Sequence, residues 1–71
     1  MNAETLRDLL RRQPFEPFEV RMTNGDVHQI RHPELAMIVG ARMVVGYPDT
    51  GRVAILSLLH VAAVELLQTK A

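Results

Sequence analysis

The chain has no cysteine and no tryptophan, and it carries no excess of charge of either sign. The absence of cysteine excludes disulfide bonds and thiolate metal sites. Eight basic residues balance eight acidic ones, whereas proteins that bind nucleic acid by neutralising phosphates usually show a clear basic excess. A chain of 71 residues forms one small domain with a marginal core. Association with another subunit is therefore the expected reinforcement.

Hydrophobic runs of membrane-spanning length and clustered glycines are also missing. No run reaches the roughly 18 apolar residues of a membrane span, and charges interrupt the first apolar stretch where a secretory signal would need none. The four glycines are isolated, so no glycine-rich phosphate loop is expected. Arginine outnumbers lysine seven to one, which favours a bacterial origin. We expect a cytoplasmic protein that does not bind a membrane.

Residues 2–13 are predicted to form the only helix. Three leucines recur at helical spacing and define one apolar face. They are Leu6, Leu9 and Leu10. Asn2 is a suitable N-cap, and the helix should end before Pro14, because a residue that precedes proline is disfavoured in the α region. Residues 14–17 then form an extended connector that docks the helix onto the strands after it.

A hairpin comes after the connector. Residues 18–23 alternate between apolar and polar side chains, as a half-buried strand does, and Asn24-Gly25 is a strong hairpin signal. A two-residue loop would expel Ile30 to the outer face. A three-residue loop with a left-handed Gly25 would instead place His28 and Ile30 on the apolar face of the first strand. We favour the second geometry because it buries Ile30.

The rest of the chain predicts further short strands. A His-Pro-Glu sequence at 32–34 breaks the second strand, and residues 35–39 form either a short strand or a turn of helix. Strands are predicted at 43–47 and 52–57, separated by turn residues. The apolar segment 61–68 suits a helix by propensity, but it comes after a series of strands, and we predict a strand.

One helix followed by a meander of short strands is typical of a small barrel. The pattern resembles the Sm-like fold, in which a short helix precedes a bent SH3-like barrel. The pieces that carry the resemblance are residues 20–25, 53–57 and 61–66. We expect a single domain over 1–71, mainly β with one N-terminal α-helix. Its five to six short antiparallel strands would form a small Sm-like or SH3-like barrel over 18–67, with a short tail at 68–71.

The chain also resembles a set of short uncharacterised bacterial proteins. The shared pattern is Arg-x-Pro-Phe-x-Pro-Phe, here at 12–18, an Asn-Gly turn and His-Pro-Glu at 32–34. That resemblance implies no activity. Bacterial Sm-like RNA chaperones use a Tyr-Lys-His run before the last strand, and this chain has Leu-Leu-His at 58–60. Because the lysine is absent, the resemblance does not extend to their RNA-binding role.

The last two strands are the predicted subunit interface. In Sm-like rings the fourth strand of one subunit pairs with the fifth strand of its neighbour. Both candidate strands here are nearly uncharged, although exposed strand edges normally avoid that composition. The expected interface residues are Val53, Ile55, Val61, Ala63 and Leu67. We therefore expect a homo-oligomer without enzymatic activity, which serves in interaction with a protein partner.

Nucleic-acid binding is the alternative hypothesis. Arg7, Arg11 and Arg12 form the one local basic cluster, and an oligomer would concentrate several copies of it on one face. The competing interpretation is a solvated helix face. Phosphate contacts by these three arginines would make RNA binding salt-dependent.

No catalytic, cofactor-binding or metal-binding residue is predicted. His28 and His32 share a face of a strand near Glu34, but strand positions four apart lie about 13 Å apart, too far for one ion. Ser57 lies near His60 without the glycines of a nucleophile elbow. We interpret these histidines as structural.

Overall fold

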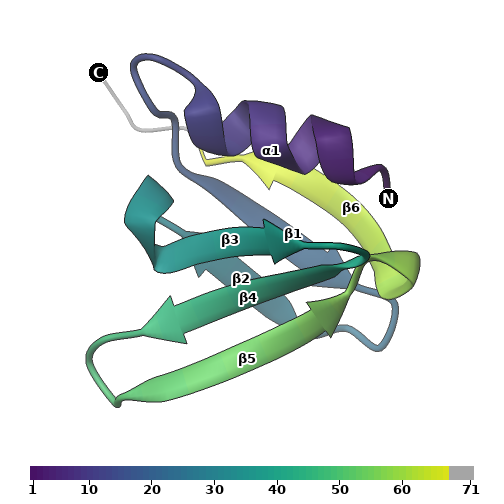
Figure 1. Ribbon diagram of the computed structural model, residues 1–71. Helices are drawn as coiled ribbons and strands as arrows, with labels where there is room; N and C mark the ends of the chain where they lie inside the picture. Colours follow the sequence, from purple (N-terminus) through teal and green to yellow (C-terminus); the bar gives the residue numbers. More distant parts are fainter. Residues whose placement is uncertain (68–71) are drawn as a thin grey trace.

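The computed structural model describes residues 1–67, which form one α-helix, two short 3-10 helices and six strands (Figure 1). In chain order these are α1 (Ala3–Arg11), β1 (Phe18–Met22), β2 (Val27–Ile30), η1 (Pro33–Leu35), β3 (Ala36–Val39), β4 (Arg42–Tyr47), β5 (Arg52–Ser57), η2 (Leu58–His60) and β6 (Val61–Leu66). The prediction of a mainly β chain with one N-terminal helix is confirmed. The predicted tail at 68–71 lies outside the described residues.

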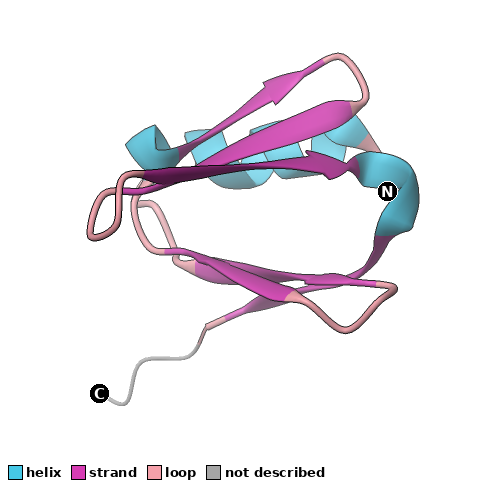
Figure 2. Cartoon of the chain, turned by 90° about the horizontal axis from the view of Figure 1, so that it is seen from below, coloured by secondary structure: helices cyan, strands magenta, loops and turns pink. Residues whose placement is uncertain are grey.

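The six strands form two antiparallel sheets. Sheet A has the order β2-β1-β6 and sheet B the order β3-β4-β5. The sheets lie over one another as two layers (Figure 2). The hydrogen-bonded ladders of the described strands therefore do not close into one barrel. The edge strands are β2 and β6 in sheet A and β3 and β5 in sheet B.

The helix α1 begins as predicted and ends early. The side-chain oxygen of Asn2 accepts the backbone N–H of Glu4 at 2.7 Å, which satisfies a free donor of the first turn. The helix ends at Arg11, two residues before the predicted end, because Arg12 already has an extended backbone with ψ of 139°. Leu6 is fully buried, and the helix packs against β3. It thereby covers one rim of the space between the sheets (Figure 1).

The hairpin of β1 and β2 has the three-residue loop that buries Ile30. Gly25 has φ of +96°, and its N–H donates to the carbonyl of Met22 at 3.0 Å. Val20 lies opposite His28, and Ile30 has no exposed surface. A side chain at Gly25 would be strained at this φ. Burial of one isoleucine thus predicted the loop geometry correctly.

Both ambiguous segments are resolved by pairing. Residues 35–39 were predicted as a short strand or a turn of helix, and the structure contains both. The 3-10 helix η1 ends at Leu35, and β3 begins at Ala36. The last apolar segment is a strand, as predicted, because it pairs along β1 with Val64 opposite Val20. Leu67 extends this pairing, since its N–H donates to the carbonyl of Pro17 at 2.9 Å.

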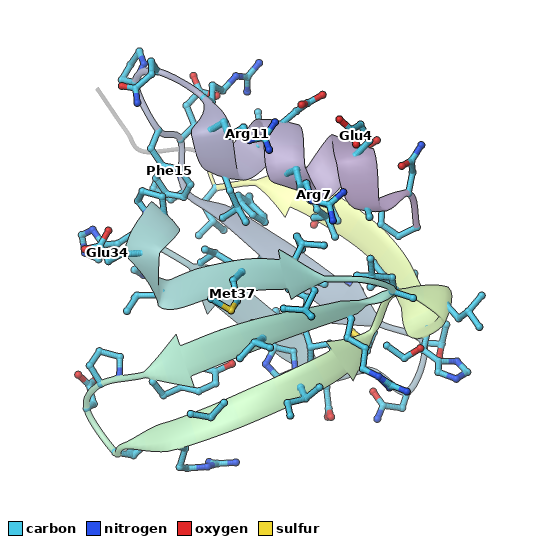
Figure 3. The ribbon with its side chains drawn as sticks, viewed as in Figure 1. Glu4, Arg7, Arg11, Phe15, Glu34 and Met37 are labelled. Carbon is cyan, nitrogen blue, oxygen red and sulfur yellow. The ribbon has the colours of Figure 1, made fainter. Side chains whose placement is uncertain are left out.

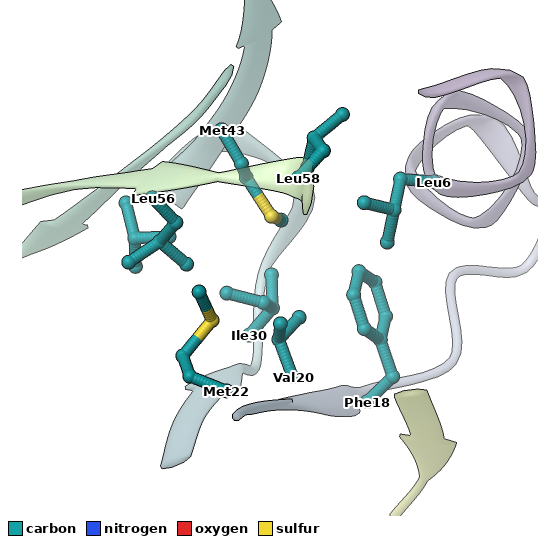
Figure 4. Packing of buried hydrophobic residues seen from close by; sticks show 9 residues of the cluster. Leu6, Phe18, Val20, Met22, Ile30, Met43, Leu56 and Leu58 are labelled. Atoms are coloured by element: carbon teal, nitrogen blue, oxygen red, sulfur yellow. The ribbon is translucent and has the colours of Figure 1, made fainter. Parts of the chain in front are cut away.

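The core lies between the sheets and under α1 (Figure 4). Its nine buried side chains are all apolar. They are Leu6, Phe18, Val20, Met22, Ile30, Met43, Val45, Leu56 and Leu58. Phe15 of the connector packs on Phe18, with ring centroids 6.1 Å apart. The connector therefore docks the helix onto the core, as the sequence predicted.

Candidate interaction surfaces

The face of sheet B that points away from the core is apolar. Successive residues of a strand point to opposite faces, so the residues between the core positions form this outer face. We call its apolar part the outer apolar face, and this part consists of Met37, Val39, Val44, Val53 and Ile55. Arg42 and Ser57 lie on the same side of the sheet at one end. Met37, on β3, is labelled in Figure 3. Met37, Val39, Val53 and Ile55 are 56%, 58%, 65% and 66% exposed.

These side chains are neighbours across the strands. Met37 lies opposite Val44, and Val44 lies opposite Ile55, so one apolar row crosses all three strands. The other face of the same sheet contributes Met43, Val45 and Leu56 to the core. Sheet B is therefore largely apolar on both faces, which is typical of a sheet that is covered on both sides.

A shallow hollow of about 380 Å³ interrupts the outer apolar face beside η1 and the β4–β5 turn. Met37, Val44, Val53 and Leu35 line it. Gly46 also lines the hollow. It pairs with Val53 and therefore lies on the outer face of β4. The hollow arises because Gly46 supplies no side chain there. The face thus has both protruding apolar side chains and a recess of similar chemistry.

The five predicted interface residues fall into two groups. Val53 and Ile55 lie together on the outer apolar face at the edge of sheet B. Val61, Ala63 and Leu67 are half-buried in or just after β6, the edge strand of the other sheet. The structure therefore places the two groups on different sheets. Their role as a subunit interface stays a prediction.

The three predicted contact arginines lie along and just after α1, where Figure 3 shows Arg7 and Arg11. Arg7 is 3.6 Å from the carboxylate of Glu4, and Arg12 is 2.9 Å from the carboxylate of Glu16. Arg11 is exposed. Acidic neighbours thus offset two of the three positive charges, which reduces the attraction of this face for phosphate.

The histidines that are close in sequence do not meet in space around an ion. His28 points into the space between the sheets, and its Nδ1 shares a hydrogen bond with the hydroxyl of Tyr47. His32 and Glu34 are exposed. Within residues 1–67, no group of three histidine or carboxylate side chains is arranged to hold a metal ion. The ring of His60 is exposed, and its carbonyl accepts the N–H of Thr23 at 2.8 Å.

The contact between His28 and Tyr47 was not predicted. It joins β2 of sheet A to β4 of sheet B, with ring centroids 6.1 Å apart. Burial raises the pKa of Tyr47 above its ordinary value of 10.0, while the nearby Arg52 guanidinium opposes this effect. The phenol therefore remains protonated at neutral pH. Two features of the sequence place these side chains between the sheets. The loop geometry turns His28 inward, and Tyr47 lies two residues after Val45 and therefore on the same inner face of β4.

Comparisons with models of known families, with curated proteins and with solved structures each found no match. Among residues 1–67, no helix is both long and apolar enough to cross a membrane.

Proposed function

We propose that this chain is a non-enzymatic module that associates with copies of itself and serves in protein interaction. The observation that carries the proposal is the outer apolar face of sheet B. In our proposal the two sheets correspond to a small Sm-like or SH3-like barrel, and β5 lies at the centre of the contact between copies.

The distribution of apolar side chains supports this proposal. Eight large apolar side chains are exposed against nine that are buried in the core. The exposed ones are Met1, Val27, Met37, Val39, Val53, Ile55, Leu59 and Leu66. Four of the eight share one face, whereas scattered surface hydrophobics need no explanation. Removing that face from water would stabilise the assembly by about 25 cal/mol per Å² of apolar surface.

A second copy is a suitable partner for this face. An interface about a two-fold axis must be self-complementary, and the outer apolar face combines the protruding Ile55 with the hollow beside Gly46. The free edge of β5 adds backbone groups with little charge to repel another strand. In this proposal Val61, Ala63 and Leu67 of β6 supply the second edge.

RNA binding through the N-terminal helix is the weaker hypothesis. The ion pairs of Arg7 and Arg12 with Glu4 and Glu16 leave the helix face nearly balanced in charge. Phosphate contacts depend on an excess of positive charge. We therefore expect no salt-dependent shift with single-stranded RNA.

The test is the mass of the assembly in solution. Ile55→Lys places a charge in the middle of the outer apolar face, so we expect it to reduce the mass measured by light scattering to that of one chain. Thr23→Lys is the matched control, because Thr23 is an exposed residue next to sheet A, and it should leave the mass unchanged. A wild-type chain that is monomeric at all micromolar concentrations would overturn the proposal.

A further inference from the structure

The backbone of β2 has a free edge with a defined set of donors and acceptors. The N–H of Met22 donates to the carbonyl of Asp26 at 2.8 Å, which sets the phase of the hairpin. Antiparallel pairs alternate between hydrogen-bonded and non-hydrogen-bonded residues. His28 and Ile30 therefore face β1, whereas the N–H and C=O groups of Val27 and Gln29 face away from it. Since β2 is an edge of sheet A, these groups are free for another strand.

A groove lies along this edge. It encloses about 860 Å³ between β2, the β4–β5 turn and the start of β5. His28, Gln29, Arg31, Tyr47 and Arg52 are among the residues that line it. A second hollow of about 410 Å³ shares Asp26 and His28 with it. Together the two hollows extend along the whole of β2. They lie on the side of the molecule where β5 is the edge strand of sheet B.

The middle of the groove is rich in hydrogen-bond donors. Nδ1 of His28 and the hydroxyl of Tyr47 share a hydrogen bond, which leaves Nε2 of the imidazole without a part in this contact. Arg52 lies opposite Tyr47 in the β4–β5 register. Arg31 comes directly after β2, and its guanidinium donates to Gln29 at 2.9 Å. These groups favour an acceptor that carries negative charge.

Two carboxylates also line the groove and are not part of this donor cluster. Asp26 belongs to the hairpin turn, where its carboxylate accepts the side-chain amide of Asn24 at 3.3 Å. Asp49 lies in the β4–β5 turn. The side chains of His28 and Arg52 therefore lie between the acidic residues of the two turns.

We propose that this groove binds a short extended peptide segment of a partner protein. The segment adds to the free edge of β2 as a further antiparallel or parallel strand, which is a common mode of peptide recognition. One of its inward side chains is a carboxylate that lies against Arg52 and the imidazole of His28. The free edge of β2 belongs to sheet A and the outer apolar face to sheet B, although the groove borders the hollow of that face and shares Tyr47 and Arg52 with it.

The size of the edge favours a peptide over a second folded copy. The strand β2 has four residues and is therefore about 13 Å long. Pairing along so short an edge would bury only a small part of the roughly 800 Å² that each partner buries in a standard protein interface. A single extended segment can instead enter the groove and use both its free edge and its floor.

The test begins with a display library of random nine-residue peptides selected on the immobilised full-length chain. We expect the selected peptides to share an acidic residue flanked by β-branched residues. Gln29→Pro removes an N–H from the free edge without removing a bond to β1, and edge strands tolerate proline. We expect about tenfold weaker binding to this variant. The matched reference is Gln29→Ala, which loses the same side chain but keeps the N–H, so Gln29→Pro should bind about tenfold more weakly than Gln29→Ala.

A second measurement leaves the protein unchanged. N-methylation of each peptide residue in turn should weaken binding at alternate positions only, because alternate N–H groups of a strand face its partner. Arg52→Gln should reduce the selection of acidic residues.

The inference is overturned if the library gives no binder, if Gln29→Pro does not weaken binding, or if N-methylation has no alternating effect. It is also overturned if Gln29→Pro lowers the mass of the assembly, since a second copy would then occupy the edge.

Discussion

The two sheets have similar inner faces and opposite outer faces. Most of the outer face of sheet A is polar: it presents Glu19, Arg21, Gln29 and Glu65 beside Val27 and Ala63. Arg21 lies 3.0 Å from Glu19 and 3.8 Å from Glu65. Most of the outer face of sheet B is methionine, isoleucine and valine, with Arg42 at one end. A sheet with one polar face is complete once its other face is covered. In our proposal, sheet A is stable beside water, whereas sheet B gains its outer layer from another copy of the chain.

The largest expected difference in stability is between a residue of the core and a residue of the outer apolar face. Phe18→Ala should lower the free energy of unfolding by about 3–5 kcal/mol, because it removes a fully buried ring from the core. Met37→Ala should change it by no more than about 0.5 kcal/mol when measured on the dilute, unassociated chain. Urea denaturation measures both values. A large loss for Met37→Ala in the dilute chain would show that the outer apolar face belongs to the fold itself.

An intermediate effect compares the hairpins of the two sheets. Gly25 in sheet A and Gly51 in sheet B have φ of +96° and +74°, and a Cβ on either would meet no atom within 4 Å. Backbone strain is therefore the cost of a side chain, and Gly25→Ala and Gly51→Ala should each destabilise the chain by about 1–2 kcal/mol. Thermal unfolding measures both variants. If the two losses differ severalfold, the hairpins are not equivalent supports of their sheets.

The smallest expected effect concerns the contact that joins the sheets. Because the pKa of Tyr47 is raised above 10.0 in the folded chain, the folded state retains the phenol proton longer than the unfolded state does. The resulting stability is present below pH 10.0 and is lost as the pH rises through the folded pKa. Tyr47→Phe should show a flatter alkaline stability profile.

The chain offers a direct measurement of this pKa. Tyr47 is the single tyrosine, so an ultraviolet absorbance titration reports on this phenol alone. Titration at or below the ordinary tyrosine value would contradict the burial of Tyr47 between the sheets.

Much of the local structure was predictable because it depends on neighbouring residues. The strand over 52–57 has its predicted bounds, and the requirement to bury Ile30 identified the correct loop at Gly25. The helix was predicted two residues too long, because the proline rule gives a limit and not the point at which Arg12 leaves the helix. Local propensity also could not separate the short helical turn η1 from β3 within residues 35–39.

The surfaces were less predictable because they depend on how the strands stack. The sequence identified Val53 and Ile55 as interface candidates, but not Met37 and Val39, since the type of their segment was open. The meeting of His28 with Tyr47 requires the packing of one sheet on the other, which no sequence spacing defines. The groove along β2 results from the same packing.

Methyl NMR with a soluble paramagnetic agent tests the covering of sheet B most directly. If copies of the chain cover the outer apolar face, the methyl signals of Met37, Val39, Val53 and Ile55 are protected from the agent at high protein concentration and lose that protection on dilution. The methyl signals of Ile30 and Leu6 should be protected at every concentration, because the core buries them. Full attenuation of these signals at all concentrations would show that no second copy covers the outer apolar face.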